Sequence, residues 1–445
     1  MSRMPSGRRY LEGNFAPVTT EIAAFDLPTL GKLPQSLGGR YCRTGPNPRP
    51  GADPDHYHWS AGAGMVHAVE LARGRAVSYR NRWIEPQAMP RGHDSELMVP
   101  PGTGNAALLQ HAGRLYATSE MALPLELSGS LDTLAASNFG GSMPAGTVSH
   151  AHQDRLTGDL HMLAYHFEAP YLCHHRIDPR GRLAETRALP MHRPAMVHDF
   201  ALTAEFLVVF DLPVLFSEDA LLDGQPVPYR WQPEAPARVG LVPRHADPEA
   251  TEWFDLPPCW ITHVIGARQV ADQVEVDAVR QPARYHRDLR GEDEGPGQLL
   301  RCTLQRRRGV ALVEILDAAA QDLPVQDPRL SAGEGRWLWT TAMAATPDGC
   351  HLPAGRCLYR HDLRAGTRDV IDLGERMAGE FSFVPAHSRA EEGQGWLVGY
   401  AWDPQRDMSE LLVLLADEPS AEPLASVSLP GRVPFGNHGE WLGQA

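Results

Sequence analysis

The sequence lacks the features that define several large classes of protein. No apolar run in the 445 residues approaches the ~18 residues that span a membrane. The net charge of −14, with Arg306–Arg308 as the longest basic run, disfavours a nucleic acid partner, because neutralising phosphates takes clustered lysine and arginine. Residues 1–9 include three arginines, but no apolar core of the kind that a signal peptide has follows them. We therefore expect a cytoplasmic protein that does not bind nucleic acid.

Cysteine is also scarce and is not arranged for cross-linking or for zinc. The chain has six cysteines, none of them in a Cys-x-x-Cys pair. In a chain of this length such scattered residues are typical of free thiols and not of a disulfide framework. The hydrophobic content of 42% is ample for a core. The cysteines are Cys42, Cys173, Cys259, Cys302, Cys350 and Cys357.

Helical periodicity over ten or more residues is hard to find, whereas strand patterns recur from end to end. Short runs rich in β-branched and aromatic residues, such as residues 159–165 and 273–279, alternate with glycine-containing turns such as residues 178–181. Many short antiparallel strands in one long chain predict an all-β fold, a β-propeller, although no WD or kelch repeat is present. No linker divides the chain, so residues 1–445 are expected to form a single domain. Residues 223–236 and 322–328 are proline-rich and are predicted to be long loops.

Four of the twenty histidines stand at the edges of strand-like runs, beside small, polar or turn-forming residues. They are spread over almost 300 residues and can meet only in a closed ring. Neutral imidazole suits iron, zinc, copper and nickel alike, so the ligand type leaves the metal open. Four histidines would saturate a tetrahedral zinc, whereas a six-coordinate iron would keep two positions for dioxygen and substrate. Carboxylates that accept the outer ring N–H groups are then expected around the site. The four are His152, His198, His263 and His438; His161, His166 and His174–His175 are equally conspicuous as bare residues.

Several segments, taken in their order along the chain, are similar to the motifs of one known family. Each is weak alone, but together they cover nearly the whole length. They are residues 13–18, residues 37–48 with the string Arg-Thr-Gly-Pro-Asn-Pro, residues 151–159, residues 197–203, residues 260–264 and residues 433–441. On these segments the chain resembles the carotenoid cleavage oxygenase family.

The resemblance implies a seven-bladed β-propeller with one Fe(2+) on its axis and molecular oxygen as co-substrate. The reaction it implies is oxidative cleavage of a carbon–carbon double bond to two carbonyl products, by a dioxygenase. His152, His198, His263 and His438 would be the metal ligands, with no other catalytic side chain. We prefer His152 to His150 because Ala151 precedes it and the turn at residues 156–159 follows it. The first motif is then about two residues shorter than in the family.

Three carboxylates fall where the family keeps glutamates around its histidines. Glu120 and Glu380 match the family residue type, whereas Asp322 stands where the family has a third glutamate. Aspartate is one methylene shorter. We therefore expect Asp322 to need a ~1 Å approach of the backbone or a bridging water to reach its histidine.

The substrate is predicted less directly. Family members that cleave stilbenes and related phenylpropanoids carry a lysine before the first outer glutamate, where this chain has Ser119. Its absence favours an apolar carotenoid or apocarotenoid over a stilbene. An apolar rim formed by residues 212–216 and Leu221–Leu222 would allow peripheral contact with a membrane. Two other classes are a hydrolase or lactonase propeller with calcium or zinc, and a ligand-binding propeller without iron. Aromatic residues available to line a tunnel are Trp59, Tyr165, Phe167, Phe210, Phe216, Trp260 and Phe435.

Overall fold

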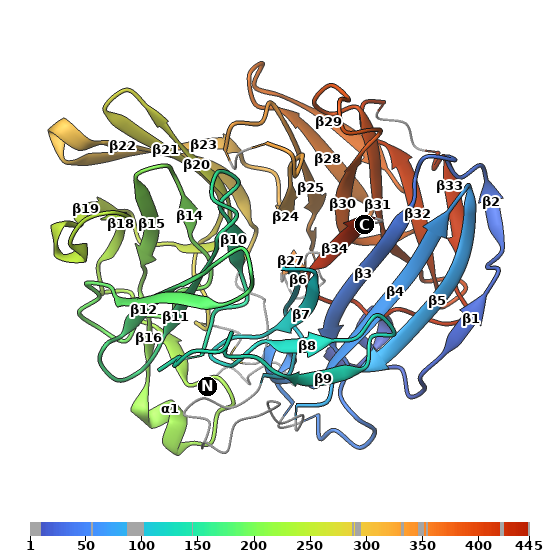
Figure 1. The fold of residues 1–445 in the computed structure, drawn as a ribbon, viewed down its shortest axis with the longest axis horizontal. Helices are drawn as coiled ribbons and strands as arrows, with labels where there is room; N and C mark the ends of the chain where they lie inside the picture. Colours follow the sequence, from blue (N-terminus) through green and yellow to red (C-terminus); the bar gives the residue numbers. More distant parts are fainter. Residues whose placement is uncertain are drawn as a thin grey trace.

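A computed structural model describes ten parts of the chain, and residues 1–9 and Cys350 lie outside them. Seven sheets of four or five antiparallel strands stand around a common centre (Figure 1). The all-β, seven-bladed propeller predicted from the sequence is confirmed. The described parts are residues 10–54, 57–86, 102–144, 146–286, 289, 295–330, 333–345, 351–352, 355–418 and 422–443.

The blades are numbered here along the chain, with the strands of each given from the centre outwards. Blade 1 contains β34 (Gly439–Gly443), β3 (Gly39–Pro46), β4 (Gly64–Ala72), β5 (Arg75–Trp83) and β1 (Ala23–Phe25). Blade 2 contains β6 (Ala107–His111), β7 (Arg114–Thr118), β8 (Leu125–Leu127) and β9 (Thr133–Ala136). Blade 3 contains β10 (Ala151–Gln153), β11 (Leu160–Tyr165), β12 (Leu172–Ile177) and β13 (Leu183–Ala188). Blade 4 contains β14 (Ala201–Leu202), β15 (Phe206–Asp211), β18 (Ala237–Pro243) and β19 (Glu252–Leu256).

Blade 5 contains β20 (Trp260–Val270), β21 (Gln273–Gln281), β22 (Gln298–Gln305) and β23 (Val310–Asp317). Blade 6 contains β24 (Gln321–Val325), β25 (Trp337–Ala342), β28 (Cys357–Asp362) and β29 (Thr367–Asp372). Blade 7 contains β30 (Met377–Pro385), β31 (Gly395–Asp403), β32 (Met408–Leu415), β33 (Ala425–Ser428) and β2 (Thr29–Gly31). The smaller elements are the hairpins β16 (Val214–Phe216) with β17 (Tyr229–Trp231) and β26 (Ala344–Ala345) with β27 (His351–Leu352), the helix α1 (Glu218–Leu222), and the 3-10 turns η2 (Gly13–Phe15), η3 (Trp59–Ala61), η4 (Pro248–Ala250) and η5 (Arg306–Arg308).

The two ends of the chain close the ring. The C-terminal strand β34 pairs with β3, from Gly39 opposite Gly443 to Arg43 opposite Gly439, so blade 1 combines both ends. At the other side of the same junction, β2 adds an outer strand to blade 7 by pairing with β33. The ring is therefore closed by strand pairing, and β34 enters at the centre (Figure 1).

Burial follows position within a blade. All six residues of β15 and of β11 are buried, because neighbouring blades cover both faces of the inner strands. The outer strand β29 is exposed at five of its six residues. The turns predicted between strands do use left-handed glycines, with φ of 76° at Gly158 and 78° at Gly181.

The two predicted long loops are partly wrong. Residues 321–325 form β24, the innermost strand of blade 6, and Tyr229–Trp231 form β17. Pro324 lacks a backbone N–H and cannot donate a hydrogen bond to a neighbouring strand, so the sequence alone predicts a loop. It is tolerated here because β24 is an edge strand that pairs only with β25.

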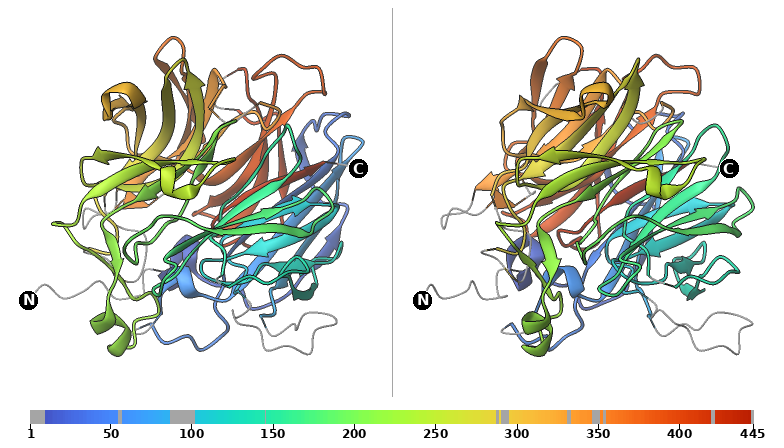
Figure 2. Two further views of the ribbon diagram at one scale, coloured as in Figure 1. Left: turned by 60° about the vertical axis from the view of Figure 1, so that its left-hand side comes forward. Right: turned by 90° about the vertical axis from the view of Figure 1, so that its left-hand side faces the viewer.

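The helix α1 lies at one extremity of the molecule in both views of Figure 2. Its Leu221 and Leu222 are 49% and 78% exposed, whereas Leu212 and Val214 of the same predicted rim are buried. Within the described parts, none of the helices has the length and apolarity to cross a bilayer. Peripheral contact with a membrane therefore stays a prediction that rests on two leucines.

Candidate metal centre

Each blade contributes one side chain to a polar cluster at the centre of the ring. Four blades supply histidines and the other three supply carboxylates. Residues from opposite sides of a ring can touch only near its axis, so this arrangement fixes the place of the cluster. The histidines are His150 (before β10, blade 3), His198 (before β14, blade 4), His263 (in β20, blade 5) and His438 (before β34, blade 1); the carboxylates are Glu120 (after β7, blade 2), Asp322 (in β24, blade 6) and Glu380 (in β30, blade 7).

Three of the imidazole rings pack around the ring of His150. Its ring centroid lies 4.8 Å from that of His198, 5.3 Å from that of His263 and 4.6 Å from that of His438. The Nε2 atoms of His263 and His438 are 3.2 Å apart. Donor atoms of His150, His263 and His438 all lie within 4.8 Å of one another, and Nε2 of His150 is buried without a hydrogen-bond partner. Converging nitrogen donors of this kind suit a transition metal ion.

The outer carboxylates hold three of the rings through Nδ1. Glu120 Oε1 lies 3.0 Å from Nδ1 of His198, and Glu380 Oε1 lies 3.1 Å from Nδ1 of His438. Asp322 Oδ1 lies 2.6 Å from Nδ1 of His263. A carboxylate at Nδ1 assigns the proton to that nitrogen and leaves the lone pair of Nε2 free for a metal.

The surroundings shift the pKa values of two of the histidines in opposite directions. Burial, followed by the nearby His438 and His198, holds the pKa of His150 well below its usual value. Burial also lowers the pKa of His438, but the charge and hydrogen bond of Glu380 outweigh it and raise that pKa. His150 therefore stays neutral, the protonation state in which imidazole coordinates a metal.

Bulges in the inner strands aim these side chains at the centre. The pairing of β20 shifts on both sides of His263, the pairing of β24 shifts between Asp322 and Val325, and the pairing of β30 shifts between Ala378 and Phe381. A bulge inserts an unpaired residue, bends the strand and redirects its side chain. Asp322 thereby reaches His263 by a direct contact, and the expected bridging water is not needed.

His152 does not join the cluster, which corrects the prediction made from the sequence. Its Nε2 lies 2.9 Å from Oδ1 of Asp199, and its ring packs edge-on against Phe200 with centroids 4.6 Å apart. It lines a polar cavity of about 500 Å³ together with Asp154 and other residues, whereas the histidine cluster borders a different cavity. The position predicted for His152 is taken by His150. The sequence contained a signal for this assignment. If His150 is taken as the histidine of the first motif, that motif is no longer about two residues shorter than in the family.

A second cavity, of about 70 Å³, opens directly onto His198, His263 and His438. Four of its other lining residues are aromatic, and most of the rest are polar or small. Of the seven aromatic residues predicted for a tunnel, three line it, Phe210 lines another cavity, and Tyr165, Phe167 and Phe216 are absent from its described lining. The sequence analysis missed Tyr285 and Arg284, which follow β21 without a recognisable motif. The aromatic residues of the lining are Trp59, Trp260, Tyr285 and Phe435.

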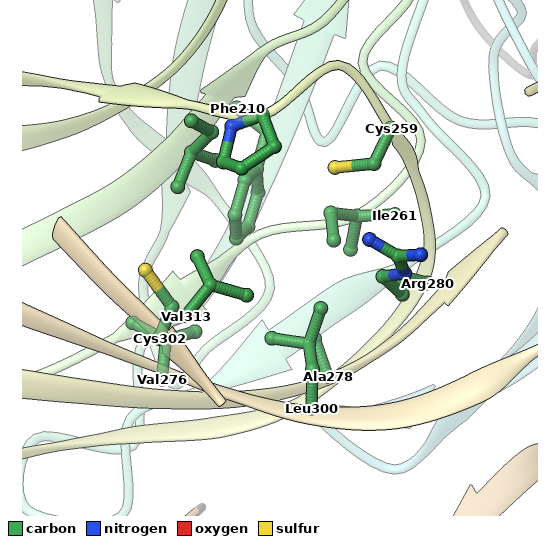
Figure 3. A pocket seen from close by; sticks show the side chains of 11 residues that line it. Phe210, Cys259, Ile261, Val276, Ala278, Arg280, Leu300, Cys302 and Val313 are labelled. Carbon is green, nitrogen blue, oxygen red and sulfur yellow. The ribbon is translucent and has the colours of Figure 1, made fainter. Parts of the chain in front are cut away.

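A third cavity, of about 20 Å³, is apolar and lies on the other face of β20 (Figure 3). Cys259 and Ile261 line this cavity. Trp260 and Thr262, which alternate with them, line the cavity beside the histidine cluster. Burial raises the pKa of Cys259 to about 11 and that of Cys302 to about 12, so neither thiol is an activated nucleophile. Its remaining lining is aliphatic except for Phe210 and Arg280, and we assign it to core packing.

The chain is similar to known proteins over its whole length. The family model described as retinal pigment epithelial membrane protein matches residues 15–443. The "Carotenoid cleavage oxygenase" of Mycobacterium tuberculosis is 34% identical, with 97% of each chain covered. The "Carotenoid 9,10(9',10')-cleavage dioxygenase 1" of Arabidopsis thaliana is 28% identical over 96% of this chain and 89% of its own.

Solved structures show the same fold. The lignostilbene dioxygenase of Pseudomonas brassicacearum has a TM-score of 0.87 at 24% identity, with 98% of each chain covered. A cobalt-substituted apocarotenoid oxygenase of Synechocystis has a TM-score of 0.85 at 20% identity, with 99% of each chain covered. The family match and the 34% identical relative set aside the hydrolase and ligand-binding propellers considered from the sequence alone.

Proposed function

The chain belongs to the carotenoid cleavage oxygenase family and is a dioxygenase, and on this premise we propose a metal, a set of ligands and a substrate class. The metal is one Fe(2+) per chain, and the substrate is a carotenoid or apocarotenoid. The observation that carries the proposal is the convergence of four imidazole rings, three of them held at Nδ1 by a carboxylate. The proposed ligands are His150, His198, His263 and His438.

The side chains around the metal position it and balance its charge. Four neutral imidazoles leave the double positive charge of Fe(2+) in place, and Glu120, Asp322 and Glu380 offset it from behind the rings. Iron, when bound, supplies the redox chemistry that couples dioxygen to cleavage of the alkene. Trp59, Trp260 and the other aromatic side chains of the lining hold the conjugated chain of the substrate beside the histidines and exclude water.

The overall reaction needs no acid or base from the protein. One carbon–carbon double bond breaks, each of its carbons gains one oxygen atom of the same dioxygen molecule, and two carbonyl products result. No proton is taken up or released. The titratable groups that line the cavity are the three histidines that face it, Glu120 and Asp322 behind them, Arg284 and Tyr285, and the balance assigns none of them a proton to transfer.

Arg284 supports a second candidate substrate class. Its side chain is buried at 5% exposure, and its guanidinium carbon lies 4.9 Å from the ring centroid of Tyr285 in the wall of the metal-facing cavity. A guanidinium binds a phenolate or a carboxylate. A stilbene or other phenylpropanoid alkene with an ionisable end is therefore the alternative, although Ser119 replaces the lysine typical of such enzymes.

Metal analysis and product analysis test the proposal together. We expect wild-type protein supplied with iron(II) to retain iron and to cleave one class within a panel of apocarotenoids, stilbenes and vinylphenols. Labelled dioxygen should place one labelled oxygen in each of the two carbonyl products, as measured by mass spectrometry. His150→Ala should abolish iron binding, whereas the exposed control His192→Ala should keep it. Full iron content and turnover in His150→Ala would refute the ligand set.

A further inference from the structure

We propose that His152 and Asp199 form a positioning pair behind the metal centre, which ties three neighbouring blades together and sets the spacing of three histidines. The pair consists of the imidazole of His152 in β10 and the carboxylate of Asp199 just before β14. Neither side chain belongs to the ligand set. The inference rests on the proposed metal site and concerns how tightly that site is held.

The Asp199 carboxylate is the centre of this arrangement. Its Oδ1 lies 2.9 Å from Nε2 of His152 and 2.7 Å from the backbone nitrogen of Phe200. Its Oδ2 accepts the backbone N–H of Val264 at 2.6 Å. Because an ionised carboxylate only accepts hydrogen bonds, we assign the donating hydrogen to Nε2 of His152. Asp199 is 4% exposed, and its contacts with Phe200 and Val264 are buried, whereas its contact with His152 is partly buried.

Each group in the arrangement stands next to a proposed ligand. His152 follows His150 by two residues, and Asp199 and Val264 directly follow His198 and His263. A displacement of any of these contacts is therefore passed to a ligand through at most two residues of backbone.

Strand pairing does not link these three blades at their inner strands. The strands β10, β14 and β20 are the inner edges of three separate sheets, and none pairs with another. Asp199, in blade 4, instead links the two neighbouring blades by accepting the N–H of Val264 from blade 5 while it binds His152 from blade 3. Charge-assisted hydrogen bonds of this kind are stronger than those between neutral groups.

His152 contributes to the arrangement in two separable ways. Its Nε2–H satisfies one of the three acceptor contacts of a buried carboxylate, and loss of such a donor leaves the charge less well compensated. Its ring also packs edge-on against Phe200. A leucine would keep apolar contact with Phe200 and remove only the donor, whereas a glutamine would keep a donor.

The test measures how fast the metal leaves. Protein loaded with iron(II) or cobalt(II) is mixed with excess chelator, and the dissociation rate is compared among wild type, His152→Leu, His152→Gln and His175→Leu. His175 is a matched control, because it is a buried histidine of blade 3 whose Nδ1 makes a hydrogen bond of 2.9 Å to Thr186, away from the cluster. The absorption spectrum of the cobalt form reports the ligand geometry, and thermal unfolding of the metal-free form reports stability.

We expect His152→Leu to release metal roughly 10–100-fold faster than wild type and to shift the cobalt spectrum, as loss of groups behind the ligands generally does. His175→Leu should lower thermal stability without either effect, and His152→Gln should restore part of the retention. Wild-type release rates in His152→Leu would overturn the proposal. Complete failure to bind metal, as expected for His150→Ala, would instead identify His152 as a ligand.

Two further outcomes separate this inference from the proposed function. If wild type binds neither metal, the proposed metal site itself fails and the positioning pair fails with it. If His152→Leu does not fold, Asp199→Asn replaces it in the same assay, since asparagine keeps an acceptor for Val264 and removes the charge that His152 binds. An unchanged release rate in Asp199→Asn would then refute the pair.

Discussion

Asp322 stands where the family has a glutamate, and the local backbone explains how the shorter side chain reaches His263. Leu323, directly after it, has a φ of 55°, and the pairing of β24 with β25 shifts between Asp322 and Val325. A left-handed residue within a bulge is costly for a leucine and indicates a position that the surrounding fold imposes. The distorted strand brings the shorter carboxylate within 2.6 Å of Nδ1 of His263.

Removal of the Asp322 carboxylate should weaken the metal site more than the fold. We expect Asp322→Ala to lower metal affinity by about 10–100-fold, because His263 loses the acceptor that orients its ring. Asp327→Ala is a matched control, since Asp327 is equally buried but pairs with Arg329 at 2.5 Å. Calorimetric titration with the metal checks the affinity. Equal losses in both variants would show that Asp322 acts only through stability.

For individual residues, the sequence predicted the types of side chain at the site better than the exact position of each one. His198, His263, His438 and the three carboxylates meet in the structure as the motifs suggested, and their role as a metal site stays a prediction. His152 was wrong because its preference rested on one neighbouring alanine and a turn. Spacing within the motif was the better guide, because it counts residues between fixed points of the fold.

Close backbone contact between two elements sets the place of His438. Gly45, in β3, lies so near the turn before β34 that an added Cβ would stand 2.4 Å from Cα of Gly436. In the same region, Thr44 donates its N–H to the carbonyl of His438 at 3.2 Å and accepts the N–H of Asn437 at 3.1 Å. The Arg-Thr-Gly-Pro-Asn-Pro string is thus a support for the fourth histidine.

A methyl group at Gly45 should push these two elements apart. We expect Gly45→Ala to destabilise the fold by about 1–3 kcal/mol, as overpacking of a tight contact does, and to weaken metal binding through His438. The control Gly443→Ala changes a glycine of the partner strand β34 that has open space around its Cβ position. Denaturant unfolding and metal titration measure both effects. Similar behaviour of the two variants would mean that the close approach is unimportant.

The elements were predictable in kind but not in their irregularities. Alternating residues and turn glycines predict short strands, and β11 and β21 lie where they were expected. The bulges at His263, Asp322 and Glu380 depend on contacts between blades, which leave no mark on local periodicity. Pro324 is a similar case. Its local preference predicts a loop, but the position of β24 at the inner edge of its blade allows a strand.

At the scale of the whole molecule, the seven blades share one polar centre, so binding of the proposed metal would be coupled to closure of the ring. The cluster joins residues from every blade, including blade 1, where β34 and β3 bring the ends of the chain together. A metal that binds only the closed ring stabilises it by mass action. This coupling explains why the histidines lie so far apart in the sequence.

Buried neutral histidines outside the metal site should make the propeller sensitive to acid. Burial is the main cause that lowers the pKa of His67 to about 3 and those of His161, His175 and His361 to about 4, against about 6.5 in an unfolded chain. Between pH 6.5 and 4 the unfolded state therefore binds protons that the folded state does not. Stability rises with pH wherever the unfolded state binds more protons, so lowering the pH from 7 to 5 costs about 2 kcal/mol of folding free energy for each such histidine.

We expect the unfolding free energy of metal-free protein to fall steeply between pH 7 and pH 5, measured by denaturant unfolding at each pH. The metal-free form is used because metal release would otherwise add its own pH dependence. His361→Gln should make the slope shallower by about one proton, because glutamine keeps polar contact with Gln321 and does not titrate. The exposed His192→Gln should leave the slope unchanged. A slope in His361→Gln equal to that of wild type would show that His361 takes up its proton without unfolding, and that its burial is relieved within the folded ring.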